Sequence, residues 1–409
     1  MHHRSEEAGQ GHPVPAPLPG HAPTQYRSRR PARAERAAPA ARAVLAAAGA
    51  LLALWAAPAR ADLLIGQTAG FTGPAAAGVK EAADGAHLVF DALNAQGGLH
   101  GQKIVLKSLD DGFEPKRSAA NAATLAQDGA IALFLSRGTP HTQALLPVLA
   151  EARIPLVGPS TGAMVLHQPV NPWVFNVRTS YQRETERTVQ HLTQIGVSRL
   201  AVAQVDDSFG NDAVQGALRA LKARQLAAVA LQKFDRDKPD LTPLIAAIVK
   251  ADPQAVLTIG TGQVVADIVA RLRAAGSHAQ VATLSNNASA GFIKSLGAFS
   301  HGVLVSQVFP SERATVVPMV RDAADALRAQ HPGQELTPAM LEGYAAAKVL
   351  VEGLRRAGKD PSRASLQKAL ESMGRYDLGG LEVSFSPTDH TGLDLVDLSI
   401  IDARGHFTR

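Results

Sequence analysis

From residue 62 onward, short apolar runs alternate with longer stretches whose apolar residues recur at helical spacing. Helical stretches such as 82–95 and 264–275 lie between the runs. Alternation of this kind is typical of parallel sheets that are covered by helices on both faces. The apolar runs predict strands at 63–67, 103–109, 131–135, 155–157, 199–204, 228–233, 255–259, 280–284 and 303–306.

The alternation falls into two blocks with no low-complexity linker between them. The first block ends near residues 174–178, and the second opens with 199–203 after the helical stretch 185–195. We therefore predict an α/β fold of two doubly wound αβα lobes with a ligand cleft between them. After Pro310 the pattern is mostly helical and then strand-like, at 316–328, 337–357, 363–372, 381–385 and 395–401.

Doubly wound sheets bind ligands at the carboxyl ends of their strands, where loops and helix N-termini gather. In the first block these loops are rich in glycine and hydroxylated residues, which offer N–H and O–H donors to an anion. A carboxylate is therefore a natural ligand. The loops are 71–74, 136–142 and 158–162 in the first block and 206–210, 260–262 and 285–287 in the second.

The chain begins with a long basic segment that leads into an apolar run at 43–57. The run is too short for a comfortable membrane span, and a small-x-small cleavage site, Ala59-Arg60-Ala61, follows it. We predict that 1–61 is a signal peptide with its basic leader, cleaved after Ala61, and that the rest is a soluble periplasmic protein. Arg29-Arg30 leaves twin-arginine export open beside the Sec route.

Cleavage at this point changes the charge balance, because residues 1–61 hold eight of the 41 basic side chains and three of the 36 acidic ones. The remaining 348 residues carry 33 of each sign, which argues against nucleic acid as a partner. The chain has no cysteine, so it has no disulfide, thiol nucleophile or lipidated cysteine. No His-x-x-x-His or His-Glu-x-x-His spacing occurs, and we predict neither a metal nor a cofactor.

Residues 158–162 contain a Gly-x-Ser-x-Gly pattern, which leaves open an exported serine hydrolase with Ser160 as nucleophile. Asp389-His390 or His406 would complete its triad. Two observations speak against this alternative. The fold of such hydrolases needs one continuous sheet, whereas the strands here form two blocks, and Pro159 restricts the preceding glycine to extended geometry. We predict no catalytic residue.

The strand-end loops hold six short motifs in a fixed order: Phe71-Thr72-Gly73-Pro74, Ala92-Leu93-Asn94-Ala95-Gln96-Gly97-Gly98-Leu99-His100-Gly101, Asp110-Asp111 with Pro115, Ile154-Pro155 with Gly158-Pro159-Ser160, Asp207-Ser208-Phe209-Gly210, and Gly276. In these motifs the chain resembles the branched-chain amino-acid binding proteins of ABC importers, which include the Leu/Ile/Val-binding protein and have the type I periplasmic binding fold. The likeness covers residues 62–409.

The resemblance implies two lobes that are joined by three hinge strands and close on a small molecule. Transferred to this sequence, the first lobe holds 62–178 and 309–393, and the second holds 179–308 and 394–409. The protein would be a monomer that delivers its ligand to an ABC permease with its ATPase. A sensor that feeds a signalling receptor would need the same closed form, so this alternative stays open.

The resemblance also implies which loops contact the ligand. Gly138 and Thr139 match the loop that binds the ligand's carboxylate, and residues 160–162 match a second head-group loop. Phe209 matches an aromatic residue that covers the ligand, and Tyr181 lies where the hinge meets the cleft. The predicted ligand-binding residues are Gly138, Thr139, Ser160, Thr161, Gly162, Tyr181, Phe209, Thr261 and Asn286.

Several positions depart from the family's pattern. Gly162 stands where amino-acid binders usually have a threonine, and Asn286 falls near the acid that pairs with the ligand's ammonium. Gly78 and Thr261 replace aromatic residues and leave room for a larger ligand. Without that acid the pocket lacks the charge-assisted hydrogen bond to an ammonium, which is about twice as strong as a neutral one. We therefore expect the pocket to bind a carboxylate- or amide-bearing metabolite at least as readily as leucine or valine.

Purely structural roles are the alternative explanation for several of these residues. Serine and threonine at strand ends also serve as helix N-caps, so Thr139 and Ser160 could have that role alone. Phe209 could belong to the core. A single arginine in a loop is usually a solvated surface charge, and we expect this of Arg137.

Overall fold

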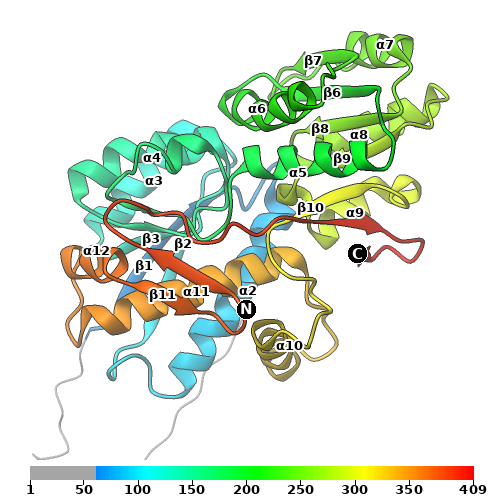
Figure 1. Ribbon diagram of the computed structural model, residues 1–409. Coiled ribbons are helices and arrows are strands. Elements are labelled where there is room, and N and C mark those ends of the chain that lie inside the picture. Colours follow the sequence, from blue (N-terminus) through cyan, green and yellow to red (C-terminus); the bar gives the residue numbers. More distant parts are fainter. Residues whose placement is uncertain (1–60) are drawn as a thin grey trace, which may run out of the picture. The chain divides into compact units, whose positions relative to one another are not determined.

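The structure is a computed structural model that describes residues 61–409 (Figure 1). The predicted signal peptide, with its leader and the Arg29-Arg30 pair, therefore lies outside the described residues except for Ala61. None of the helices in the described part of the chain combines the length and apolar character that a membrane span needs.

The first sheet is parallel throughout, with the spatial order β2-β1-β3-β4-β5. β1 and β2 pair along their whole length, from Leu63 opposite Ile104 to Ala69 opposite Asp110. Because the strand order reverses between β1 and β3, the loops that follow these two strands leave a crevice at the carboxyl edge of the sheet. The strands are β1 (Leu63–Ala69), β2 (Ile104–Asp110), β3 (Ala132–Phe134), β4 (Leu156–Val157) and β5 (Val174–Phe175).

Helices cover both faces of this sheet (Figure 1). One face packs on α2 (Ala76–Ala95), α10 (Pro318–Gln330), α11 (Pro338–Ala357) and α12 (Arg363–Glu371), and the other on α3 (Pro115–Gln127) and α4 (Thr139–Ala152). α2 and α11 touch backbone to backbone, because a Cβ at Gly343 would lie 1.8 Å from the carbonyl oxygen of Ala82. A small antiparallel hairpin, β11 (Gly374–Asp377) and β12 (Glu382–Phe385), joins the same layer. We call this group the first lobe.

The second sheet has the order β14-β13-β10-β9-β8-β6-β7. The strands from β7 to β10 are parallel, and β13 and β14 add antiparallel pairs at one edge. The order reverses between β6 and β8, which creates a second crevice of the same kind. The strands are β6 (Leu200–Val205), β7 (Ala230–Phe234), β8 (Ala255–Ile259), β9 (Gln280–Thr283), β10 (Leu304–Gln307), β13 (Asp397–Ile401) and β14 (Phe407–Thr408).

Five helices and their apolar faces pack around this sheet into one continuous core. They are α5 (Tyr181–Gln194), α6 (Ser208–Ala223), α7 (Thr242–Ala251), α8 (Gly262–Ala274) and α9 (Ala290–Leu296). With the short 3₁₀ turns η2 (Ser285–Asn287) and η3 (Gly297–Phe299), this group forms the second lobe. A third short turn, η1 (Met164–Leu166), lies in the first lobe.

The chain passes between the lobes after β5, after β10 and after β12. Two of these crossings are joined by backbone hydrogen bonds, from Gly392 N to Asn176 O at 2.8 Å and from Leu393 N to Val177 O at 3.0 Å. The prediction of a two-lobed α/β fold is therefore confirmed, and each predicted strand begins and ends within two residues of the observed one. The lobe boundaries at 178, 308 and 393 remain a prediction.

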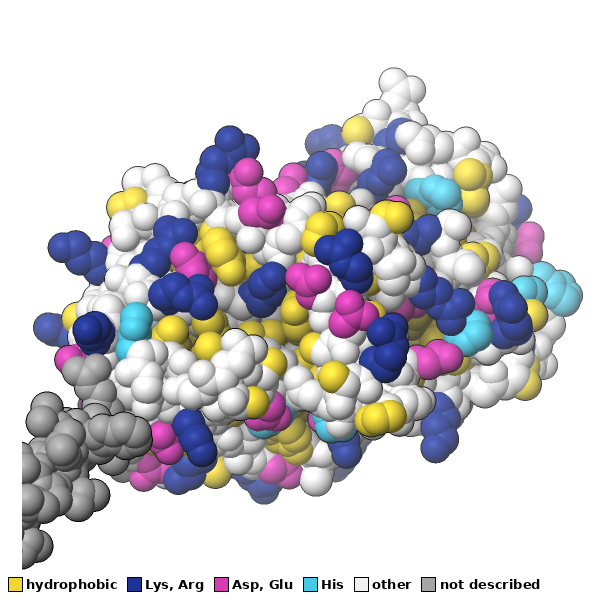
Figure 2. All heavy atoms as spheres, turned by 90° about the horizontal axis from the view of Figure 1, so that it is seen from below, with side chains coloured by type: hydrophobic (Ala, Val, Ile, Leu, Met, Phe, Trp, Pro, Cys, Tyr) yellow, Lys and Arg dark blue, Asp and Glu magenta, His cyan; other side chains and the backbone are white. Residues whose placement is uncertain are grey.

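Charged side chains are distributed evenly over the face seen in Figure 2, where basic and acidic groups alternate and no patch of one sign forms. The pattern agrees with the equal numbers of basic and acidic residues after residue 61.

Candidate functional site

A cavity of about 550 Å³ lies where the carboxyl ends of both sheets meet. Both crevices contribute to it, because the loops after β1, β2 and β3 form one wall and segments of the second lobe form the other. The first-lobe wall consists of residues 73–78, Phe113 and residues 137–139. The second-lobe wall consists of Tyr181, Phe209, Arg236, residues 261–263, Asn286, Asn287, Ser289, Gly291, Phe292 and Ser295.

Six of the nine predicted ligand-binding residues line this cavity, and three lie directly behind it. Those in the wall are Gly138, Thr139, Tyr181, Phe209, Thr261 and Asn286. Those behind it are Ser160, Thr161 and Gly162.

The loop before α4 is shaped by Gly138, which has a positive φ of 91°. A Cβ at this position would lie 2.7 Å from Nδ1 of His141, whose ring stacks on Phe113 with centroids 4.0 Å apart. Only glycine suits both the left-handed backbone and this close approach. Thr139 then begins α4, and its Oγ1 lies 2.8 Å from Oγ1 of Thr161 in a buried hydroxyl pair.

The second head-group loop supports the wall from behind. Ser160 Oγ accepts a hydrogen bond from Arg137 Nη1 at 2.7 Å, and Ser160 N donates to Ser136 O. Gly162 touches the first crossing, because a Cβ there would lie 2.6 Å from Thr179 O and 2.7 Å from Tyr181 N. This contact explains why no hydroxylated side chain stands at residue 162, which is buried against backbone.

Arg137 differs from the solvated surface charge that we expected. Its side chain is only 7% exposed and lines the cavity. Besides Ser160, its guanidinium binds the second lobe, since Nη2 donates to the carbonyl oxygen of Asn286. The sequence could not reveal this, because Asn286 is 149 residues away along the chain.

Three aromatic rings, those of Tyr181, Phe209 and Phe292, lie in the second-lobe wall among polar residues and glycines. Tyr181 and Phe209 pack with their ring centroids 4.7 Å apart, and burial raises the pKa of the Tyr181 hydroxyl. Asp207 caps α6 by accepting from the backbone N–H groups of residues 209 and 210, and it forms an ion pair with Arg236. The Arg236 guanidinium lies 5.4 Å from the ring centroid of Phe113 in the opposite wall.

Asn286 is held by its amide nitrogen, which donates to Gly260 O at 3.0 Å and to Asn287 Oδ1 at 3.1 Å. Its Oδ1 is buried and has no partner among the described residues. Nearby, the Thr261 side chain makes no capping hydrogen bond at the start of α8. Asn286 therefore offers one buried acceptor where a carboxylate would offer a negative charge.

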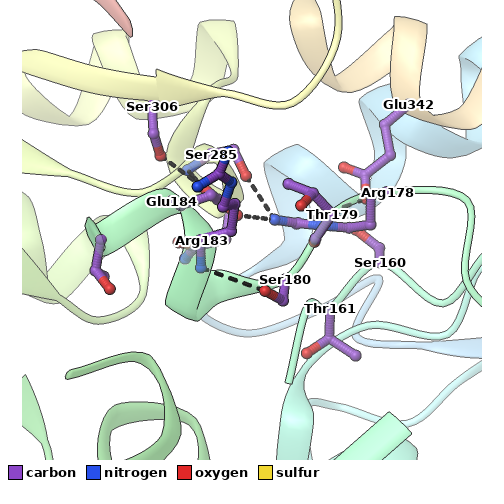
Figure 3. Close-up of polar contacts among 12 residues, drawn as sticks. Ser160, Thr161, Arg178, Thr179, Ser180, Arg183, Glu184, Ser285, Ser306 and Glu342 are labelled. Carbon is purple, nitrogen blue, oxygen red and sulfur yellow. Dashed lines mark hydrogen bonds and ion pairs between the residues drawn. The ribbon is translucent and has the colours of Figure 1, made fainter. Parts of the chain in front are cut away.

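A buried ion network links the hinge to the cavity (Figure 3). Arg178 lies on the first crossing, is only 1% exposed, and binds Glu184 of α5 and Ser285 Oγ. Glu184 also accepts from Ser285 N and Ser306 Oγ, while Arg178 Nη1 lies 3.8 Å from Glu342 of α11. The guanidinium carbon is 4.6 Å from the ring centroid of Tyr181, so the network fixes one wall of the cavity.

Several residues of the site were missed in the sequence. Phe113, Arg236 and Phe292 line the cavity, and Arg178 with Glu184 supports it. The only signal was positional, because Phe113 follows the Asp-Asp motif at the end of β2 and Arg178 stands at the block boundary. Within residues 61–409 no group of three or more His, Asp and Glu could hold a metal ion.

Two doubly wound lobes with a cavity between the carboxyl ends of their sheets are the architecture of a protein that binds a small molecule. The family model described as periplasmic binding protein matches residues 63–401, and the chain belongs to this family. The resemblance seen in the sequence motifs is thereby confirmed. Members are binding proteins and not enzymes, which sets aside the hydrolase alternative at Ser160.

Individual relatives agree with this assignment. The chain is 26% identical to Leu/Ile/Val-binding protein homolog 3 of Brucella melitensis over 77% of this chain and 85% of that protein. The crystal structure of a substrate-binding periplasmic protein from Ralstonia solanacearum is 33% identical with a TM-score of 0.79, covering 85% of this chain and 99% of that one. An extracellular ligand-binding receptor from Verminephrobacter eiseniae is 29% identical with a TM-score of 0.75, over 85% and 100%.

Proposed function

We propose that this protein is the periplasmic receptor of an ABC importer, and that it captures a small organic acid without an α-ammonium group. Closure of the lobes on the ligand would present a shape that the permease recognises. Family membership and the Leu/Ile/Val-binding relatives support the transport role. Release into the periplasm would follow cleavage after Ala61, and the protein would act as a monomer.

The ligand class rests on one observation. Among the described residues that line the cavity, two are arginines and none is Asp or Glu. The ammonium of an amino acid would lose its hydration there and gain no carboxylate in return, which is costly in a buried site. A carboxylate, by contrast, finds the positive charge of Arg137 and the donors of the Gly138-Thr139 loop.

The remainder of the cavity suits an apolar ligand body. Phe113, Tyr181, Phe209 and Phe292 contribute rings to its walls. Thr261, which the resemblance places where amino-acid binders have an aromatic residue, leaves space for this body, whereas the space beside Gly78 is taken by Arg137, whose Nη2 would lie 3.4 Å from a Cβ there. In this proposal Tyr181 and Phe209 cover the body of the ligand, and Asn286 accepts a hydrogen bond from a neutral donor on it.

A thermal-shift panel tests the ligand class, because a ligand that binds only the folded state raises the melting temperature. The panel pairs leucine with isocaproate, which lacks only the ammonium, and phenylalanine with hydrocinnamate, which differs in the same way. We expect larger shifts from isocaproate and hydrocinnamate than from their amino-acid partners. A largest shift from leucine, with none from the deaminated acids, would show that the ligand class is wrong.

The sensor alternative shares this binding site and differs only in the partner. Adjacent permease and ATPase genes would support import, and an adjacent histidine-kinase gene would support sensing. The binding measurement holds for both.

A further inference from the structure

We propose that Arg137 is the specificity-determining residue of the cavity, and that it makes recognition of the ligand's anionic end depend on lobe closure. The inference rests on the proposed organic-acid function. It adds which residue binds the ligand's negative charge and how that contact depends on lobe closure.

Three arginines lie in or beside the cavity, and two of them are neutralised by carboxylates. Arg178 pairs with Glu184, and Arg236 pairs with Asp207. Arg137 forms no ion pair with any carboxylate of residues 61–409, although its side chain is only 7% exposed. Because arginine stays charged in proteins, the cavity holds one buried positive charge that the described residues leave unbalanced.

Burying an unbalanced charge is unfavourable unless a partner supplies the opposite charge. The guanidinium has five N–H donors, of which one binds Ser160 Oγ and one binds the Asn286 carbonyl oxygen. A ligand carboxylate would restore the balance and take up donors of the same group. Its oxygens would then lie near Thr139 and the first turn of α2, since a Cβ at Gly78 would be 3.4 Å from Arg137 Nη2.

The two protein contacts of Arg137 belong to different lobes. Ser160 follows β4 of the first lobe, while Asn286 lies in η2 of the second lobe. The guanidinium can keep both only when the lobes are together. Only in the closed form does Arg137 keep its contacts with both Ser160 and Asn286. An anion that binds the guanidinium in this position therefore favours the closed form.

The test compares carboxylate with amide, using isocaproate against isocaproamide and leucine against leucinamide. Each pair differs in the charge of the head group while the apolar body stays the same. We measure, by calorimetry, the ratio of the two affinities within each pair for wild type, Arg137→Gln and Arg137→Lys. The expected loss for Arg137→Gln is roughly 10- to 100-fold in carboxylate affinity, with amide affinity changed by less than about threefold.

Arg137→Lys keeps the charge and should recover part of the ratio, though not the two-lobe contact. The control is Arg273→Gln in α8, which also removes an arginine that has no ion pair within residues 61–409, but at a position outside the cavity. We expect its carboxylate-to-amide ratio to stay within about threefold of wild type, because the charge that it removes does not face the ligand.

Closure is measured with spectroscopic labels, which the absence of native cysteine makes simple. Cysteines replace Ala120 of α3 in the first lobe and Ala246 of α7 in the second, both exposed. Isocaproate should shift the label distance to a shorter value in wild type and much less in Arg137→Gln at equal occupancy.

Two failures are distinguishable. If wild type binds leucine more tightly than isocaproate, the proposed ligand class is wrong. The role of Arg137 in binding the carboxylate would then still be tested by comparing leucine with leucinamide. An Arg137→Gln protein that keeps the wild-type carboxylate-to-amide ratio in both pairs would overturn the role of Arg137. If no carboxylate of the panel binds wild type, both proposals are wrong.

Discussion

At the scale of single residues, the hydroxyl pair of Thr139 and Thr161 allows contact with the ligand to be distinguished from structural support of the loop. Both residues share one buried hydrogen bond, 2.8 Å between their Oγ1 atoms. Only Thr139 also lines the cavity. Replacing either threonine by valine removes the same protein contact, so any difference in ligand affinity between the two variants reports on the ligand.

We expect Thr139→Val to weaken isocaproate binding by about 1 kcal/mol, because a hydroxyl donor to the carboxylate is lost. Thr161→Val is the matched control and should change affinity by less than half of that. Both variants should lower the free energy of unfolding by similar amounts, measured by urea titration. Equal effects on affinity would mean that Thr139 serves only the architecture of its loop.

At the scale of elements, α2 and α9 meet across the cleft more closely than side chains normally permit. A Cβ at Gly291 would lie 2.2 Å from Cβ of Ala77, and Glu81 of α2 accepts from the backbone N–H groups of Ala290 and Gly291 at 3.1 and 3.0 Å. These contacts join helices of different lobes. Substitution at Gly291 should therefore disturb closure and leave each lobe's own packing intact.

Gly291→Ala is expected to weaken ligand binding at least about tenfold, because closure would have to displace one helix from the other. The melting temperature of the ligand-free protein should change little. Gly343→Ala is the contrasting variant, since its Cβ would meet Ala82 O within the first lobe at 1.8 Å. It should lower the melting temperature strongly, and a similar loss in Gly291→Ala would contradict the interlobe interpretation.

Elements with a plain apolar pattern could be predicted from the sequence, and those whose buried face is polar could not. The strand Ala255–Ile259 was predicted to the residue, because four of its five residues are apolar. By contrast, α5 begins at Tyr181, four residues before the predicted start, because Glu184 is a buried residue of its first turn. The burial of that carboxylate depends on Arg178, a partner that no local pattern reveals.

The candidate site shows the same division. The loops that form it follow from the parallel strand order, so Gly138 and Thr139 could be placed at the cavity in advance. Which side chains of those loops face the ligand depends on contacts between lobes. Arg137 was expected on the surface, yet its partners Ser160 and Asn286 bury it.

At the scale of the whole molecule, acid stability depends on a histidine beside the hinge. His167 is buried, its Nδ1 lies 2.9 Å from Thr391 Oγ1, and burial together with the Arg178 charge lowers its pKa from 6.5 to about 4. The folded protein therefore binds this proton less readily than the unfolded chain does. The resulting stability is fully present above pH 6.5 and is lost as the pH falls towards 4.

We expect wild type to lose about 2 to 3 kcal/mol of unfolding free energy through this group between about pH 7.5 and pH 4.5. His167→Gln should show a correspondingly smaller loss in urea titrations at the two pH values. His301→Gln, at an exposed position, is the control and should follow wild type. A His167→Gln protein with the wild-type pH slope would exclude this histidine as the source.

The packing of α11 on α2 also determines the order in which the two lobes can complete their folding. The second lobe takes β6 to β10 from one continuous stretch, residues 200–307, whereas the first lobe must wait for residues 338–357 to cover a helix made some 260 residues earlier. Until synthesis reaches that point, the apolar face of α2 has no cover. Contacts this distant in sequence form slowly. The core of the first lobe is therefore completed only after residue 357, whereas the parallel strands of the second lobe are complete at residue 307.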